Sequence, residues 1–520
     1  MTVEQVKKQI DHLFEKQYPV LSLWQTLADH FYPERADFTT TRNVGDELAD
    51  GLMNTQPVLM RRDLCNSFSA MLRDGEWFKI VTAGGATDHN GNMWLDFARK
   101  RLMTMMGRNN KTFVRATKQG DHDYGTFGQC VISTELNKQR TGLLYRNWHL
   151  RDCAWFEDED GSVGGVARKW KPTIHQLIAV FGEDKVHRRI IERSKREPFA
   201  ECEIRHFVIP ARMYGDESIN TPFVSLFIDA ENNHMIEEVG INHRYYTVPR
   251  FQTIAGAPYA YSPATITALP DARTLQAMTF TLMEAAERYA RPPIIATERA
   301  IRSDVDLSSD GITWVDDEYD ERLGAALRTL QQDRGGFPIG KDAQLDIVAT
   351  LQSAFYLNKI TLPPIGHEMT ATEVIERMKQ YRRENLPLFA PIESEYNGSL
   401  CEISFEIAMA GGLLGSPYDI PESLQSSEIE FKFNSPLSES QEEEKATQFA
   451  QVSRMLAEAV QFDESAVDNI DFDIALRDAS RGVGVPNMWM RAVDDIMERR
   501  EQRQAAALAQ TAIEMEQGNL

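Results

Sequence analysis

The stretch 367–414 constrains the fold most, because its helical pattern is longer than an ordinary globular helix. Thr370 and Glu373 have the spacing of a capping box, which marks a helix N-terminus. The apolar pattern then stays in phase through two prolines: Val374, Met378, Tyr381, Leu388, Ile392, Tyr396, Leu400, Ile403 and Ile407. We predict one long helix that is kinked at Pro387 and Pro391, because an internal proline removes a backbone donor. Periodicity alone leaves open an ordinary long helix in an α-rich domain.

Composition limits the class of protein. A length of 520 residues favours about three or four domain-sized units. We predict no transmembrane helix, because no run of 18 apolar residues occurs, and no signal peptide at the start Met1–Gln5. The five cysteines are odd in number and far apart, which indicates reduced thiols of a cytosolic chain and neither a disulfide framework nor a zinc site.

The net charge of −22 bears directly on nucleic acid. A protein that grips DNA from outside usually has a basic footprint, and the overall composition shows none. Two interpretations remain open: the chain never touches nucleic acid, or it lets nucleic acid slide without sticking. The segment 298–346 is acidic, with 12 acidic and 6 basic residues, and is either a solvated surface or a channel wall that repels phosphate.

The first half of the chain mixes helical and strand patterns. Helices are predicted over 3–33, 57–72, 93–106 and 110–123, and Pro19 could divide the first of them. Gly125 and Gly128 predict a tight turn into a strand at 130–133. Short strands bounded by turn residues then follow, with one helix among them: 77–81, 145–148, 153–156, 164–170, 205–209 and 222–228, and the helix 173–181.

The second half is mainly helical. A helix over 269–291 begins with Leu269-Pro270-Asp271, where proline suits the first turn. A short-stranded insert and a second helix over 343–357 precede the long helix. After it we expect one strand and three helices: 429–433, 438–462, 472–479 and 487–515. The fold class predicted from these patterns is α+β, mostly helical.

The hexapeptide Met369-Thr370-Ala371-Thr372-Glu373-Val374 heads the long helix. It resembles the head-to-tail connector (portal) proteins of short-tailed bacteriophages, and further segments resemble them in the same order from Trp24 to about Leu437. The resemblance implies a portal fold with an α/β wing, a helical stem, a small α/β clip, a kinked long helix and a helical crown. The implied boundaries are wing 1–262, first stem helix 263–292, clip 293–342, second stem helix 343–357, tunnel loop 358–368, long helix with its return to the wing 369–437, and crown with C-terminal tail 438–520.

The resemblance also implies a function. Portal proteins form a ring of twelve at one capsid vertex, through which double-stranded DNA is packaged and ejected with weak, non-specific contacts. Their partners are terminase, major capsid and scaffolding proteins and tail adaptor proteins, in the virion and, during assembly, in the host cytoplasm, with no membrane. The expected DNA-channel and tunnel-loop residues are Asn358, Lys359, Ile360, Thr361, Leu362 and His367, and the expected clip residues are Arg302 and Arg322.

Two other classes of protein stay open: a nucleotide-driven packaging enzyme, and a tail or scaffolding protein without a channel. The run Gly335–Lys341 has the spacing of a phosphate-binding loop, but Asp342 stands where Ser or Thr would hold magnesium, and Pro338 lacks a donor. We therefore predict that this run is a glycine-rich connector before the second stem helix. His367 is not followed by a second histidine four residues later, since that residue is Ala371.

Two acidic runs, 316–318 and 442–444, are interpreted as solvated faces more readily than as ion sites. The sequence therefore predicts no catalytic residue, no cofactor and no metal site. We expect a structural protein that is not an enzyme.

Overall fold

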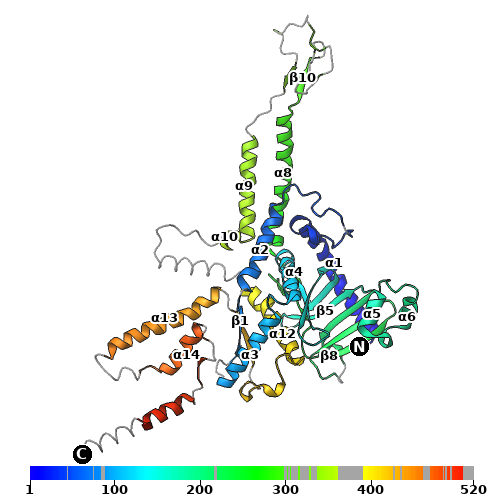
Figure 1. The fold of residues 1–520 in the computed structure, drawn as a ribbon. Coiled ribbons are helices and arrows are strands. Elements are labelled where there is room, and N and C mark those ends of the chain that lie inside the picture. The colour runs from blue at the N-terminus through cyan, green and yellow to red at the C-terminus, as the bar shows by residue number, and fades with distance from the viewer. Residues whose placement is uncertain are drawn as a thin grey trace, which may run out of the picture. The chain divides into compact units, whose positions relative to one another are not determined.

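The computed structural model describes residues 1–43, 45–73, 75–83, 88–215, 219–297, 301, 305, 314–316, 322, 327–329, 336–360, 390–425, 428–433, 436–460, 469–483, 485, 489–491 and 495–506. The chain divides into two compact units. Unit 1 comprises Met1–Ser22, Leu64–Ser262 and Lys359–Leu520, and unit 2 comprises Leu23–Asp63 and Pro263–Asn358. Figure 1 labels their elements. The predicted α+β, mostly helical class is confirmed. Among the described residues, no helix has the length and apolar character that crossing a membrane requires.

The N-terminal helix α1 is continuous from Val3 to Phe31, with Pro19 inside it. The proline therefore does not divide the helix. Val6, Ile10 and Leu13 repeat at helical spacing and are buried in unit 1. They share an apolar core with side chains of the main sheet: Ala154, Ala167, Phe207, Ile209, Val224, Leu226 and Ile228.

The main sheet of unit 1 is antiparallel and has the order β4-β5-β6-β7-β8. Its strands are β4 (Cys153–Glu157), β5 (Val163–Trp170), β6 (Ile204–Pro210), β7 (Phe223–Asp229) and β8 (His234–Ile241). The strand predictions find the first four. They miss β8, because this edge strand exposes Glu238, Val239 and Gly240 in succession and has no clean alternation.

Helices α5 (Ile174–Phe181) and α6 (Arg188–Ser194) lie between β5 and β6 along the chain. Thr173 begins α5 with a capping box to Gln176, so the helix starts where the sequence predicts. A second apolar core joins both helices to the sheet: Ile174, Leu177, Val186, Ile190, Cys202, Ile204 and Ile236. The short helix α7 (Ala211–Tyr214) follows β6.

A three-stranded sheet, ordered β3-β2-β9, completes the β structure around α4. Its strands are β2 (Val131–Leu136), β3 (Leu143–Trp148) and β9 (Tyr246–Thr247). The helices before it are α2 (Gln56–Leu72), α3 (His89–Met105) and α4 (Lys111–Phe127). Strand β1 (Phe78–Thr82) pairs with β12 (Ile429–Phe433), which brings the chain after the long helix back to the N-terminal half.

The predicted turn at Gly125 is wrong, because α4 continues through that residue to Phe127. A Cβ at Gly125 would lie 2.5 Å from Cys65 Sγ, so glycine is needed for the close approach of α2. Gly128 is the residue that ends the helix, with φ +82° in the left-handed region.

Unit 2 contains an antiparallel pair of helices (Figure 1). The π-helical segment η4 (Ala264–Ala268) continues into α8 (Leu269–Ala290), and α9 (Gly336–Ala354) returns beside it. The second helix begins seven residues before the predicted position 343. Between the two helices, β10 (Ile294–Ala296) pairs with β11 (Leu327–Thr329). Leu275 and Leu351 are buried, and Phe355 packs edge-on against Phe31 of the same unit.

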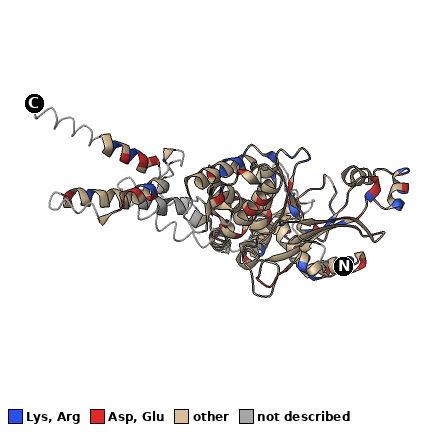
Figure 2. Ribbon diagram, turned by 90° about the horizontal axis from the view of Figure 1, so that it is seen from below, with Lys and Arg blue, Asp and Glu red and all other residues tan. Residues whose placement is uncertain are grey.

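The C-terminal region of unit 1 is helical in its described parts. The helices are α13 (Pro436–Ala459) and α14 (Phe472–Gly482), with helical backbone again over 495–506. Figure 2 shows basic and acidic residues alternating along the last of these segments. Arg500 there forms an ion pair with Asp473 of α14, at 2.7 Å.

Candidate functional site: the stem helices and the anchored long helix

Helices α8 and α9, which are the predicted stem helices, touch at a close contact that includes a glycine. A Cβ at Gly340 of α9 would lie 2.9 Å from Leu282 Cδ2 of α8, so the glycine allows the helices to approach. Gln344 Nε2 donates a hydrogen bond to Thr279 Oγ1 at 2.9 Å, one turn further along α9. Together these contacts fix the register of α8 against α9.

The position of α9 also excludes a phosphate-binding loop at Gly336–Lys341. Residues Gly336–Lys341 lie in the first turns of α9, so they cannot form the loop of exposed backbone N–H groups that cradles a phosphate. They are not the glycine-rich connector that we predicted either. Gly335 itself lies outside the described residues.

Several large apolar side chains on the stem helices are exposed in the single chain. Phe280 of α8 is 55% exposed and Leu345 of α9 is 58% exposed. Met283 and Ile339 are also more than half exposed. Burying such side chains against a second chain would remove apolar surface from water, which stabilises association by about 25 cal/mol per Å².

The chain turns sharply after α9. Tyr356 has φ +56°, which is uncommon for a residue with a side chain. The sequence predicts a loop from residue 358, whereas Leu357–Ile360 form one turn of helix, α10, with Asn358 exposed. The loop prediction is therefore wrong for Asn358, Lys359 and Ile360, since residues directly after a helix can add a further helical turn.

Most of the predicted site lies outside the described residues: Thr361, Leu362, His367, the hexapeptide 369–374, Pro387 and Arg302. Arg322 is described, and it is exposed. The acidic run 316–318 is described only at Asp316, and the side chains of 442–444 are not described.

The described part of the predicted long helix begins at Ala390. Pro391 has helical backbone angles and directly precedes a π-helical segment, η6 (Ile392–Gly398), which continues into α12 (Ser399–Ala410). A π-helical turn changes the direction of a helix and often occurs at functional sites. The part of the predicted apolar stripe that is described is buried: Ile392, Tyr396, Leu400, Ile403 and Ile407.

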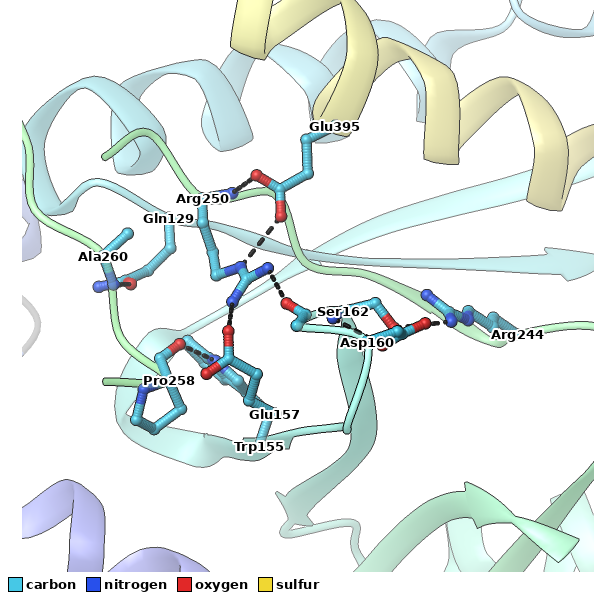
Figure 3. A network of polar contacts seen from close by, with 11 residues as sticks. Gln129, Trp155, Glu157, Asp160, Ser162, Arg244, Arg250, Pro258, Ala260 and Glu395 are labelled. Carbon is cyan, nitrogen blue, oxygen red and sulfur yellow. Dashed lines mark hydrogen bonds and ion pairs between the residues drawn. The ribbon is translucent and has the colours of Figure 1, made fainter. Parts of the chain in front are cut away.

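One charged cluster anchors η6 (Figure 3). Arg250 is only 7% exposed at its side chain, and its Nε donates to Glu395 Oε1 of η6 at 3.0 Å. Its Nη1 donates to Glu157 Oε1 at 2.9 Å, and its Nη2 donates to the Gly161 carbonyl at 2.7 Å. A planar guanidinium presents donors in several fixed directions, so one side chain ties together three distant parts of unit 1.

A second ion pair, between Arg73 and Asp121, lies beside Asn397 of η6. Arg73 and Asp121 are 3% and 2% exposed at their side chains, with Nη1 2.8 Å from Oδ1. Arg73 Nε also donates to Asn397 Oδ1 of η6 at 2.8 Å, and the guanidinium lies 4.5 Å from the Tyr396 ring centroid. Burial by itself lowers the pKa of Arg73, but the charge of Asp121, the neighbouring Tyr396 and the hydrogen bond to Asp121 together outweigh burial and raise that pKa. Burial also raises the pKa of Asp121, against the opposing charge of Arg73.

The sequence patterns missed Arg73, Arg250 and Glu395. Glu395 precedes Tyr396 of the apolar stripe, which could have marked it as a residue at the edge of the buried face. Nothing local marks the two arginines, because their partners are 48 and 145 residues away in the sequence.

The described residues offer little chemistry besides these anchors. All five cysteines are free and buried, and no group of three or more His, Cys, Asp or Glu in the described part could hold a metal. A cavity of about 90 Å³ lies beside Arg244, Tyr245 and Glu395. It is far smaller than the roughly 300–1,000 Å³ of ordinary ligand pockets, and we assign no ligand to it.

A family model described as "Bacteriophage head to tail connecting protein" matches residues 3–490. The chain therefore belongs to this family of phage connecting proteins, as the sequence resemblance indicates.

Two curated relatives carry the portal name. The chain is 23% identical to the "Probable portal protein" of Bordetella phage BPP-1 over 440 residues, which covers 81% of this chain and 76% of the relative. It is 21% identical to the "Portal protein" of Salmonella phage epsilon15 over 541 residues, which covers 99% of this chain and 93% of the relative.

Solved structures show weaker similarity. A chain from the "Virion of native gene transfer agent (GTA) particle" matches with 10% identity and a TM-score of 0.35, covering 77% of this chain and 86% of that chain. A chain from the "Neck of empty GTA particle computed with C6 symmetry" matches with 10% identity, a TM-score of 0.36 and the same coverage.

Proposed function

We propose that this connecting protein is the phage portal: a dodecameric ring at one capsid vertex through which double-stranded DNA enters and leaves. Family membership over residues 3–490 supports the class of protein. The exposed apolar side chains on the stem helices, above all Phe280 and Leu345, are the observation that supports ring formation. Helices that cannot bury these residues within one chain can bury them against neighbouring subunits. Head-to-tail contacts of this kind form a closed ring when the rotation from one subunit to the next is a whole fraction of 360°.

The remaining parts of the proposal follow the family resemblance. The clip at β10 and β11 binds terminase and tail adaptor proteins, and the wing and crown face major capsid and scaffolding proteins. ATP hydrolysis belongs to terminase, so this chain is structural and not an enzyme. The protein assembles in the host cytoplasm and ends in the virion.

The tunnel loop is proposed for residues 361–368 of the predicted segment, directly after the helical turn α10. In a water-filled bore, Lys359 of twelve subunits would touch passing phosphates, each contact being worth on the order of 1 kcal/mol in water. Deletion of 361–366 should leave ring assembly intact and let packaged DNA leak from particles. A deletion variant that no longer folds would show that this segment belongs to a core and not to the bore.

Native mass measurement tests the ring. Twelve copies of a 59.2 kDa chain give about 710 kDa. The double substitution Phe280→Glu/Leu345→Glu should leave mostly monomer at micromolar concentration, because it places charges where apolar contacts are proposed. The control is Phe199→Glu, which changes an aromatic residue that is even more exposed, at 78%, and does not belong to α8 or α9; it should leave rings intact.

Rings that form equally well in all three proteins would refute the stem contact. A wild-type chain that stays monomeric or dimeric would refute the portal itself and favour a tail or scaffolding role without a channel. Electron micrographs of the same sample should show a central bore about as wide as a DNA duplex.

A further inference from the structure

The acidic total charge conceals a long stretch without any acidic residue. Residues 97–120 contain no Asp or Glu and carry seven basic residues: Arg99, Lys100, Arg101, Arg108, Lys111, Arg115 and Lys118. Most of helix α4 belongs to this stretch. The net charge of −22 therefore does not describe the local field above α4.

The side chains of α4 divide cleanly between two faces. The inward face is buried: Phe113, Ala116, Thr117, Gly120, Asp121, Asp123 and Tyr124. The outward face is exposed: Lys111, Val114, Arg115, Lys118 and Gln119. Both acids of the helix are on the inward face, where Asp121 pairs with Arg73 and Asp123 accepts a hydrogen bond from Asn147 Nδ2 at 2.7 Å. The ionisable groups on the exposed face are therefore all cations.

A neighbouring turn adds two more basic residues. Asn110, which caps the N-terminus of α4, donates from Nδ2 to the Leu143 carbonyl at the start of β3, at 2.9 Å. The turn that precedes Leu143 exposes Lys138 and Arg140. We call the set Lys111, Arg115, Lys118, Lys138 and Arg140 the α4 basic face. None of the five forms an ion pair with another residue of the described part of the chain.

We propose that the α4 basic face is a docking surface for the phosphate backbone of duplex DNA. The inference rests on the proposed function, in which duplex DNA is the cargo, and it places a contact outside the predicted tunnel loop. Lys111 and Lys118 are seven residues apart, or about 10.5 Å along the helix axis. That length spans about three phosphates of one strand, which are about 3.4 Å apart along the duplex axis.

The composition of this face favours DNA over a protein partner. Three of its five cations are lysines, and lysine is depleted in protein–protein interfaces. Lysine is, in contrast, well suited to non-specific phosphate contacts, which require charge and no fixed geometry. Val114 is the one large apolar residue on this side of α4, at 42% exposure, and single exposed apolar residues are ordinary on protein surfaces.

The contact should be weak and strongly dependent on salt. Five phosphate contacts give a slope of about −4.5 in a plot of log affinity against log salt concentration. Affinity then falls about 500-fold between 50 and 200 mM NaCl. The rest of the chain is acidic overall and repels DNA, whereas this face attracts the phosphate backbone.

Fluorescence anisotropy with the full-length protein and a labelled 30-base-pair duplex, over a range of NaCl concentrations, tests the inference. The variant Lys111→Glu/Arg115→Glu/Lys118→Glu should lose at least 30-fold in affinity at 50 mM NaCl, and its salt slope should fall by about 3. A matched control changes three exposed cations near α6 that form no ion pair with a described residue: Arg189→Glu/Lys195→Glu/Arg196→Glu. Because both variants change net charge equally, the control should retain affinity within about threefold.

Three outcomes would overturn the inference. Equal loss in both variants would mean that only total charge matters. An α4 variant that binds duplex normally but no longer forms rings would make this face a subunit contact. If the Glu variant misfolds by circular dichroism, the neutral Lys111→Gln/Arg115→Gln/Lys118→Gln variant replaces it, with the same expected direction. Wild-type rings that do not bind duplex would refute this inference alone, whereas wild-type protein without rings would refute the proposed function.

Discussion

Replacing Arg73 with methionine removes the cation of a deeply buried ion pair and keeps most of the aliphatic volume. Asp121 is 2% exposed at its side chain and would keep a buried charge without its partner. The change also removes the hydrogen bond from Arg73 to Asn397, which holds the π-helical segment η6 of the long helix. The substitution therefore acts where η6 packs into the core of unit 1.

The expected loss is large. Breaking one side of a buried ion pair costs about 3–5 kcal/mol, because the remaining charge is left uncompensated. With a shift of about 2–4 °C per kcal/mol in a domain of 150–250 residues, the melting temperature should fall by about 10 °C. The solvent-exposed pair of Arg188 and Glu192 is the matched control, and Arg188→Met should change stability by less than about 0.5 kcal/mol.

The loss should depend on pH in a defined direction. Without Arg73, burial raises the pKa of Asp121 above its ordinary value of 3.8 with little to oppose it. The folded variant then binds a proton that the unfolded chain does not, so its stability falls as pH rises from about 4 toward the raised pKa. Arg73→Met should therefore be less destabilised at pH 5 than at pH 8.

A second substitution completes the cycle. Adding Asp121→Leu to Arg73→Met replaces both charges by apolar groups, which is often nearly neutral. Most of the lost stability should return, and the destabilisation relative to the wild-type protein should become the same at pH 5 and pH 8. Thermal unfolding of the wild-type protein, Arg73→Met, the double variant and the Arg188→Met control measures both effects. An equal loss at both pH values, with no recovery in the double variant, would refute this explanation of the site.

Two further predictions concern the core of unit 1. Burial and the charge of Arg168 hold the pKa of His206 well below 6.5 in the folded chain. The unfolded chain takes up a proton at this residue between pH 7.5 and pH 5.5, so the free energy of unfolding should fall by about 1.4 kcal/mol over that range. His206→Gln should abolish this contribution in denaturant titrations. Gly125→Ala should destabilise the protein by about 1–3 kcal/mol, because its Cβ would lie 2.5 Å from Cys65 Sγ; adding Cys65→Ala should recover most of the loss, and a lack of recovery would contradict the contact.

Helix existence was predictable from periodicity, whereas several helix boundaries were not. Pro19 lies inside α1, since the apolar face on both sides of it packs strongly enough to offset one missing backbone donor. The predicted turn at Gly125 failed for a tertiary reason, namely the close approach of Cys65. No pattern within α4 itself reveals that contact, because the two residues lie on different helices.

The start of α9 shows how one motif supports two local interpretations. Glycines with Pro338 usually indicate a connector, and that was the prediction. Proline is also favoured in the first turn of a helix, where its missing N–H would have no partner, and Pro338 lies two residues after Gly336 at the helix start. Gly340 then allows the contact with Leu282, a requirement set by the partner helix and absent from the local sequence.

Charge shows most clearly what total composition can and cannot predict. The net charge of −22 led us to expect no basic footprint, because a sum over the chain discards position. Placing Asp121 and Asp123 on the buried face of α4 removes the only acids of that helix from its surface and leaves Lys111, Arg115 and Lys118 to set the local field. Coulomb interactions with exposed charges are largely screened beyond about 10 Å in 0.1 M salt, so a passing phosphate responds to this face more than to the distant acids. An acidic protein can therefore repel DNA in general and still hold it at one face.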